Sequence, residues 1–450
     1  MQFFRREPAS PLVQPLSAQS ESPKAWLSVS ILAGLVLVET LREGGFWRAD
    51  ALVVAVASFL ILVIQVIVEP QSRRSWAVVG SLFLLALWWF VRAFTSGAVA
   101  SFFPLGASIL GFLAAFIVVQ SLESRQKQAV GLGVASLGAG AALVGFAGLI
   151  WRWYPMAMPA QHLWRLSTTL TYSDAAGLLL AMCLLIALAG GARPWLSRVA
   201  VCLCAGGLVA TQSRGAFVAF LCACLLVPLR QYGLYVAPLL AGIALGVVAV
   251  ATSPSTGHVP WLAVALVAAI AVSIARVPGL DGMAVPRRAM LIFGAAIVVA
   301  LIGSIALLHS EIALRALAPS DQDRAVEWSA AFHQFESSPF IGVGPDRLLQ
   351  FHATDGTYAH FAHNEYLQIT ADGGLVGLFL LAIALAALVR VVRRVDTLTS
   401  CAVASLVSLA VGGAFDFDWH LPVIGLLGGC LVGLAAMTPA TRAGVVHRGS

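Results

Sequence analysis

Apolar runs of about 20 residues recur along most of the chain and constrain its fold more than any other feature. A run of that length spans the hydrocarbon core of a bilayer as a helix, because a helix satisfies all of its own backbone hydrogen bonds in lipid. Charged residues make up only 11% of the 450 residues, against roughly 25% in soluble domains. The pattern therefore predicts an all-α polytopic membrane protein.

About fourteen apolar runs are long enough to be candidate spans, and twelve is the alternative count. We expect the fourteen at 25–41, 50–69, 76–94, 101–119, 129–151, 172–190, 196–212, 215–230, 232–251, 259–276, 289–308, 366–389, 398–415 and 421–437. The predicted organisation is a flexible N-terminal tail (1–24), eleven spans (25–308), a polar loop (309–365), three more spans (366–437) and a C-terminal tail (438–450).

The distribution of lysine and arginine predicts the orientation, because cytoplasmic loops carry an excess of both. If the N-terminal tail lies inside, 18 of the 27 basic residues also fall inside. Both termini are then cytoplasmic, and the 309–365 loop lies outside. The basic residues stand at the ends of apolar runs and do not cluster on one polar surface. The net charge of +6 therefore indicates membrane topology, and no nucleic-acid partner is expected.

One long polar stretch, from Glu311 to Gly377, interrupts the apolar pattern. It holds four of the nine histidines, three arginines and nine carboxylates, so it is where water and substrate could meet. The apolar spacing around Arg324 predicts an amphipathic helix on the outer surface that ends near Ser337. A tight turn with two glycines is expected to follow at 340–345.

His363 stands where this loop re-enters the membrane. An imidazole can accept a proton near neutral pH, as a general base must. Its neighbours Asn364 and Glu365 can orient it or cap the helix that follows. The small residues beyond them, which allow helices to approach closely, are Gly373, Gly374 and Gly377.

Arg214 lies in a polar break between the seventh and eighth spans, at their outer end. A charge there is costly unless it is paired or solvated, which marks a functional candidate. A guanidinium binds two phosphate oxygens at once, and Ser213 could add a donor. Arg165, before the sixth span, is a weaker case. Each arginine also has an interpretation without a functional role. Arg214 could snorkel to the membrane interface, Arg165 could form a structural pair with Asp174, and Arg324 could lie on a solvated helix face.

Two other interpretations of the sequence remain open, a metal site and a proton-coupled transporter. Metal-ligand types gather in the polar stretch, but their spacing matches no standard zinc pattern, and we expect no metal and no cofactor. These residues are His352, Asp355, His360, His363 and Glu365. A proton-coupled transporter is the other class. Its relay would need ionisable residues near the bilayer centre, and the predicted spans hold few.

Taken together, three blocks resemble the O-antigen ligase and polymerase superfamily of bacterial cell-envelope enzymes. They are Thr211–Ala216, the run from Arg324 to Pro345, and the run from His363 to Leu367 with its trailing glycines. They occur in the family's order, and with the topology they cover about 165–380. The resemblance implies a metal-independent, inverting glycosyl transfer at the periplasmic face of the inner membrane.

The resemblance also implies the substrates. The donor would be a glycan on undecaprenyl diphosphate. The acceptor would be lipid A–core in a ligase of lipopolysaccharide biosynthesis, or another lipid-linked glycan in an O-antigen or exopolysaccharide polymerase. Membrane lipids would be the other partners. We expect a ligase first, a polymerase second and a protein-glycosylating relative third.

The family's roles carry over to individual residues of this chain. His363 would be the general base on the acceptor hydroxyl. Arg214 and Arg324 would hold the donor diphosphate, with Arg165 as a possible third. The supporting residues would be Ser213, Asn364 and Glu365. The chain departs from the usual ligases of this family in its number of spans. We expect a pair of extra spans at about 232–276, which moves the expectation toward a polymerase.

Overall fold

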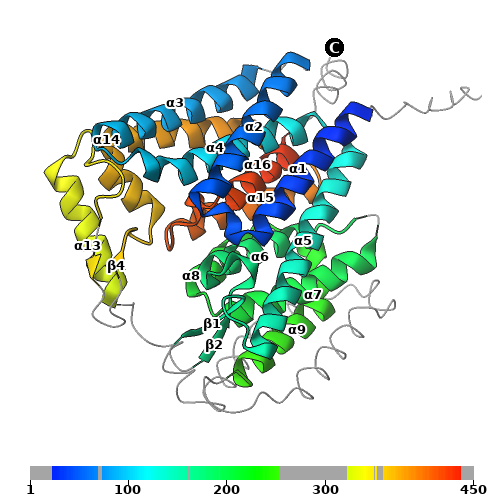
Figure 1. The fold of residues 1–450 in the computed structure, drawn as a ribbon. Coiled ribbons are helices and arrows are strands. Elements are labelled where there is room, and N and C mark those ends of the chain that lie inside the picture. The colour runs from blue at the N-terminus through cyan, green and yellow to red at the C-terminus, as the bar shows by residue number, and fades with distance from the viewer. Residues whose placement is uncertain are drawn as a thin grey trace, which may run out of the picture.

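A computed structural model describes residues 23–68, 73–160, 163–191, 193–253, 322–348, 350–351 and 358–436. These residues form a bundle of helices with two short hairpins at its edge (Figure 1). The helices of the first half are α1 (Pro23–Leu41), α2 (Arg48–Val68), α3 (Arg73–Thr95), α4 (Val99–Ser121), α5 (Ser124–Trp151), α6 (Ser173–Ala187), α7 (Pro194–Thr211), α8 (Arg214–Cys224) and α9 (Leu229–Ala251). After them come α13 (Gln322–Ser337), α14 (Glu365–Val391), α15 (Thr397–Gly412) and α16 (Pro422–Ala435). The described residues also contain three short 3₁₀ helices, η1 (Glu43–Gly45), η2 (Thr168–Leu170) and η4 (Asp418–His420).

A helix stands at every expected span that falls on described residues; the spans expected at 259–276 and 289–308 lie outside them. Seven of the described helices are long and apolar enough to cross a membrane, namely α2, α3, α4, α5, α7, α9 and α14. The helices α1, α6, α8, α15 and α16 are apolar but shorter. The multi-helical membrane architecture is therefore as predicted, whereas the count of fourteen spans is not confirmed.

The eighth expected span is shorter than its apolar run. α8 ends at Cys224, and α9 begins at Leu229. Pro228 between them disfavours helical geometry at the residue before it and instead starts the next helix. Hydropathy alone does not register this break, which explains why we expected one span at 215–230.

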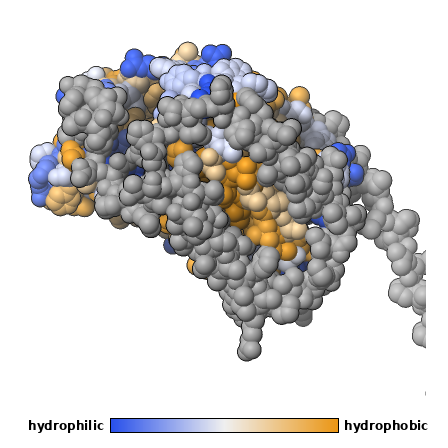
Figure 2. All heavy atoms as spheres, turned by 90° about the horizontal axis from the view of Figure 1, so that it is seen from below, coloured by the Kyte–Doolittle hydropathy of each residue, from blue (hydrophilic) through white to orange (hydrophobic). Residues whose placement is uncertain are grey.

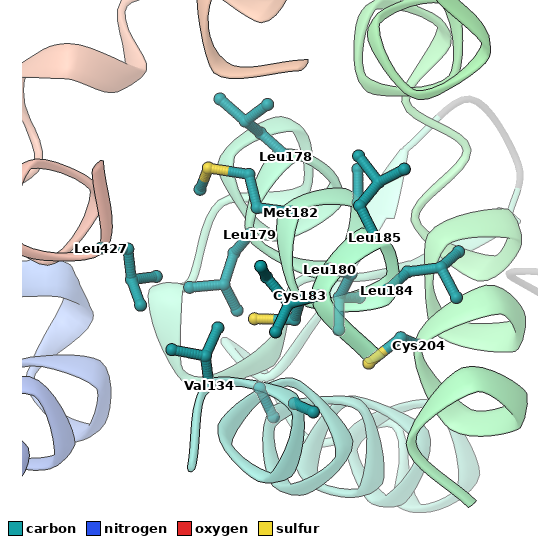
Figure 3. Packing of buried hydrophobic residues seen from close by; sticks show 14 of the residues in the cluster. Val134, Leu178, Leu179, Leu180, Met182, Cys183, Leu184, Leu185, Cys204 and Leu427 are labelled. Atoms are coloured by element: carbon teal, nitrogen blue, oxygen red, sulfur yellow. The ribbon is translucent and has the colours of Figure 1, made fainter. Parts of the chain in front are cut away.

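The short helix α6 lies in the middle of the hydrophobic core. Every residue of α6 except Asp174 is buried, and its leucines pack against Val134 of α5, Cys204 of α7 and Leu427 of α16 (Figure 3). A helix that is apolar on all sides is buried either in protein or in lipid, and for α6 the other helices of the bundle provide that burial. The helices α2 and α3, by contrast, expose large apolar side chains such as Phe59 and Phe83.

The junctions that the sequence predicts outside meet at one end of the bundle, which we call the polar end. There the start of α6, the end of α7, α13 and the segment after α15 are joined through Asp174, Thr211, Arg324 and Phe415. The junctions predicted inside meet elsewhere: Arg394 donates to the Leu226 carbonyl and Lys127 to the Ala436 carbonyl. Alternating junctions of this kind are the pattern that successive membrane crossings produce.

Two hairpins depart from the all-α prediction. β1 (Ala157–Ala160) pairs antiparallel with β2 (Leu163–Leu166), and β3 (Gln350–Phe351) pairs with β4 (Tyr358–Ala359). Pro155 and Pro159 exclude a continuous helix before α6 because proline lacks the N–H that a helix interior needs. The hairpin β1–β2 follows an exposed aromatic group, Trp151, Trp153 and Tyr154, a composition typical of the membrane–water interface.

The described surface is also divided by polarity. Seen from below, apolar side chains gather along the middle of the described surface, and hydrophilic ones lie toward its edge (Figure 2). Such a division suits a protein whose belt faces lipid and whose ends face water.

Candidate active site

The predicted base, His363, is paired with a buried carboxylate. Its Nδ1 lies 2.7 Å from Oε2 of Glu327 on α13, and the Glu327 side chain is only 1% exposed. A carboxylate can only accept, so in the neutral imidazole Nδ1 carries the proton and Nε2 keeps the lone pair. His363 also has a φ of 45°, a left-handed conformation that a residue with a side chain seldom adopts and that is often found at functional sites.

The surroundings of His363 favour its protonated form. Burial lowers the pKa of His363, but the hydrogen bond to Glu327 and the charge of Asp416 together outweigh it, and the pKa is raised from its ordinary value of 6.5. The nearby Arg324 opposes this shift. An imidazolium formed during a reaction would therefore be stabilised by Glu327.

Asn364 and Glu365 hold the start of α14 against the segment that follows α15. The Asn364 side chain accepts from the Leu367 amide at 3.1 Å, which caps the helix, and donates to the Ala414 carbonyl at 3.0 Å. Glu365 is fully buried, and its Oε1 accepts from the Trp419 amide at 2.6 Å and lies 3.3 Å from Nδ1 of His420. Asn364 and Glu365, two of the three predicted supporting residues, therefore fix backbone geometry around the site.

The segment 415–418 joins His363 to Arg324. Nη1 of Arg324 donates to the Phe415 carbonyl at 2.9 Å, and the Asp416 carboxylate accepts from the Tyr172 hydroxyl at 2.8 Å. The Phe417 ring meets the His363 ring edge to face, with centroids 5.2 Å apart. Sequence reasoning missed this segment. Its signal was two aspartates between two apolar runs, a costly arrangement in a membrane protein.

Two of the predicted diphosphate-binding arginines share one carboxylate. Nη2 of Arg165 lies 2.9 Å from Oδ1 of Asp174, and its Nε donates to the Thr211 carbonyl at 2.9 Å. Nη2 of Arg324 lies 3.5 Å from Oδ2 of Asp174 and 3.8 Å from Oδ2 of Asp416. The structural Arg165–Asp174 pair, left open from the sequence, is thus present.

A small cavity of about 10 Å³ lies among these charges, with room for about one water molecule. Among the groups that line it are Ser213, Arg324, Asp174, Asp416 and Asp418. Burial, reinforced by repulsion from Asp174, raises the pKa of Asp416 to about 6. Burial and the neighbouring Asp416 raise the pKa of Asp418 well above its ordinary range. These two carboxyl groups therefore take up protons more readily than surface aspartates do.

Ser213 and Arg214 lie at the start of α8, at the same polar end. The Ser213 hydroxyl accepts from the Ala216 amide at 3.3 Å and also hydrogen-bonds to Asp174. Arg214 is exposed and is not among the residues that line the cavity. The helices α6, α8, α14 and α16 begin at this end, and helix N-termini carry partial positive charge. Anions are favoured there.

The predicted metal-ligand types are separated in the structure. His360 lies 3.7 Å from Asp346, His363 binds Glu327, and Glu365 binds His420. His352 and Asp355 lie outside the described residues. Within the described ranges, no group of three or more histidine, cysteine, aspartate or glutamate side chains is placed to hold a metal ion.

The predicted glycine turn clamps α13 onto α14. The Val343 amide donates to the Ala371 carbonyl at 2.9 Å, and the Leu375 amide donates to the Pro339 carbonyl at 2.8 Å. Gly374, inside α14, has a φ of 64°, and a Cβ there would collide with the backbone of Phe340 and Gly342. This contact fixes α13, and with it Glu327, relative to His363.

Comparison with known families agrees with the sequence motifs. Residues 241–382 match the family described as O-antigen ligase, a range that holds Arg324, Glu327, the glycine turn and His363. Arg165 and Arg214 precede the matched range. A comparison with curated proteins gave no significant match. The family match confirms the resemblance to the O-antigen ligase superfamily, and together with the apolar helices it indicates a multi-pass membrane protein of ligase or polymerase type.

Proposed function

We propose that this protein is an O-antigen ligase. It would transfer a glycan from undecaprenyl diphosphate to a hydroxyl group of lipid A–core, at the periplasmic face of the bacterial inner membrane. The observation that carries the proposal is the His363–Glu327 pair beside Arg324, within the range that matches the O-antigen ligase family.

In the proposed reaction, the acceptor hydroxyl donates a hydrogen bond to Nε2 of His363. The hydroxyl oxygen attacks the anomeric carbon of the donor as the bond from that carbon to the phosphate oxygen breaks, which inverts the anomeric configuration. The proton passes to Nε2, and Glu327 stabilises the imidazolium through Nδ1. Undecaprenyl diphosphate departs with the bonding electrons, so the step needs positive charge on the leaving group but no metal and no cofactor.

Arg324 and Arg214 would supply that positive charge. Arg324 now has Asp174 and Asp416 as partners. We propose that the donor diphosphate replaces Asp416, whose raised pKa allows it to take a proton as the anion arrives. Arg165 acts through Asp174, which it shares with Arg324, and the exposed Arg214 would meet the phosphates from the mouth of the site.

A polymerase that joins lipid-linked repeat units is the second candidate. The pair of extra spans expected at about 232–276 favours it; α9 is the first of them, and the second lies outside the described residues. Only the acceptor would differ between the two functions, so the catalytic residues and their roles would be the same.

Reconstitution separates these functions. Purified protein in liposomes is given an undecaprenyl-diphosphate glycan, with and without lipid A–core, and the products are resolved on a gel. The ligase proposal predicts a product only when lipid A–core is present. A ladder from the donor alone would assign a polymerase. Absence of product, with solute accumulation driven by a proton gradient, would contradict both and support a transporter.

A further inference from the structure

A second polar cleft opens at the far end of α13 from Arg324. It lies between the last turn of α3, the end of α13 and the glycine turn, and its volume is about 550 Å³. Arg92 and Arg347 line it together with Gln334 and the hydroxyl groups of Ser337 and Ser338. None of the described residues that line it is a carboxylate, in contrast to the cavity around Arg324.

The two arginines are held by backbone and hydroxyl oxygens. Nη2 of Arg92 donates to the Gly342 carbonyl at 2.7 Å, and Nη1 donates to the Thr95 hydroxyl at 3.0 Å. Nη2 of Arg347 donates to the Ser96 carbonyl at 2.6 Å. The adjacent Asp346 lies near His360 instead, at 3.7 Å. These contacts orient both guanidinium groups while leaving their positive charge for a ligand.

The cleft has the chemistry of an anionic sugar site. Fixed guanidinium groups bind carboxylate or phosphate oxygens in a bidentate way. Hydroxyl and amide groups such as those of Ser337, Ser338 and Gln334 match the hydroxyl groups of a sugar.

We propose that this cleft binds an acidic segment of a glycan, one that carries carboxylate or phosphate groups. The proposal rests on the proposed function, because it extends the glycan site along α13. Gln334 and Ser337 lie ten and thirteen residues beyond Arg324, which is about 15–20 Å along the helix. A chain of several sugars that begins at the diphosphate would reach the cleft, so this cleft would select for acidic glycans.

Direct binding tests the proposal without any catalytic readout. Full-length protein in nanodiscs of phosphatidylcholine is titrated with an oligogalacturonate and with a neutral malto-oligosaccharide of equal length. We expect the acidic chain to bind more tightly, and Arg347→Glu to weaken that binding about tenfold or more. Arg347→Lys should fall between the two. Arg48→Glu, the same charge reversal at an exposed arginine of α2, is the matched control and should bind as wild type does.

Several results would overturn the proposal. One is equal binding of the acidic and neutral chains, and another is an unchanged affinity in Arg347→Glu. Phe340 and Ile341 beside the cleft are exposed, so an acidic lipid headgroup is the competing ligand. If phosphatidylglycerol in the nanodisc abolishes oligogalacturonate binding, the cleft is a lipid site and the proposal is wrong.

The proposal and the function on which it rests can fail separately. We expect His363→Ala to bind the oligogalacturonate with wild-type affinity, because His363 does not line the cleft. Loss of binding in that variant would assign the sugar to the catalytic site and overturn the proposal. Loss of glycan transfer in that variant, with binding retained, concerns the proposed function alone.

Discussion

His363 and Glu327 together account for more of the proposed chemistry than either residue does alone. The histidine was recognisable in the sequence because it stands at a polar-to-apolar boundary. Its partner was not, because Glu327 is 36 positions away and is one of nine carboxylates in the same polar stretch. The Arg165–Asp174 pair was readable as an alternative since its members are only nine positions apart.

The pH dependence of transfer tests the pair. The wild-type rate should rise as pH increases through the pKa of His363, because only the neutral imidazole accepts a proton. Glu327→Gln removes one of the two groups that raise this pKa, the other being Asp416. The rising limb of the profile should therefore move to lower pH. The maximal rate should also fall about a hundredfold, since the imidazole loses its orientation.

Glu336→Gln is the matched control for that experiment. Glu336 lies on the same helix and accepts a hydrogen bond from His333, but both side chains are exposed. We expect its rate–pH profile to coincide with that of the wild type. A Glu327→Gln profile that keeps the wild-type midpoint would show that Glu327 does not control the protonation of His363.

The elements that hold the pair are α13, the glycine turn and α14. The sequence predicted each of them, because an amphipathic spacing, two close glycines and an apolar run are local signals. It did not predict that the turn docks on the interior of α14 or that Gly374 interrupts the helical geometry there. Such contacts join residues that are far apart in the chain, and no local pattern encodes them. The β1–β2 hairpin was missed for a different reason, since its strands of four residues are too short to show an alternating pattern.

Replacing Gly374 tests this docking. Gly374→Ala places a Cβ against the backbone of the turn and forces a positive φ on a residue that resists it. We expect a destabilisation of about 1–3 kcal/mol or more, seen as a lower thermal unfolding midpoint in detergent. Gly133→Ala, in α5, meets nothing within 4 Å. That variant should be neutral or more stable, by up to about 1 kcal/mol. Equal midpoints for the two variants would contradict the proposed clamp.

At the scale of the whole molecule, hydropathy and basic residues predicted most of the arrangement. They identified the helices and grouped the junctions that meet at the polar end. They did not predict the lengths of the helices, because an apolar run does not reveal whether a helix is surrounded by protein or by lipid. α6 is the clearest case, since its fifteen residues are buried almost throughout.

The distribution of basic residues predicts which end of the bundle faces the periplasm. In a Cys222→Ser background, which removes an exposed thiol, a cysteine is introduced by Ser337→Cys or by Val395→Cys. We expect an impermeant maleimide to label Ser337→Cys in spheroplasts, and to label Val395→Cys only after permeabilisation. The opposite pattern would place the proposed active site in the cytoplasm and contradict the assigned orientation.

Glycan transfer by His363→Ala, in reconstituted liposomes, tests the central claim most directly. We predict that the rate falls by about 10²–10⁴-fold, the usual contribution of a general base. Donor binding and the yield of folded protein should match those of the wild type, because in the proposed mechanism His363 would contact the acceptor and not the diphosphate. A wild-type rate in this variant would contradict the proposed mechanism, whatever the acceptor.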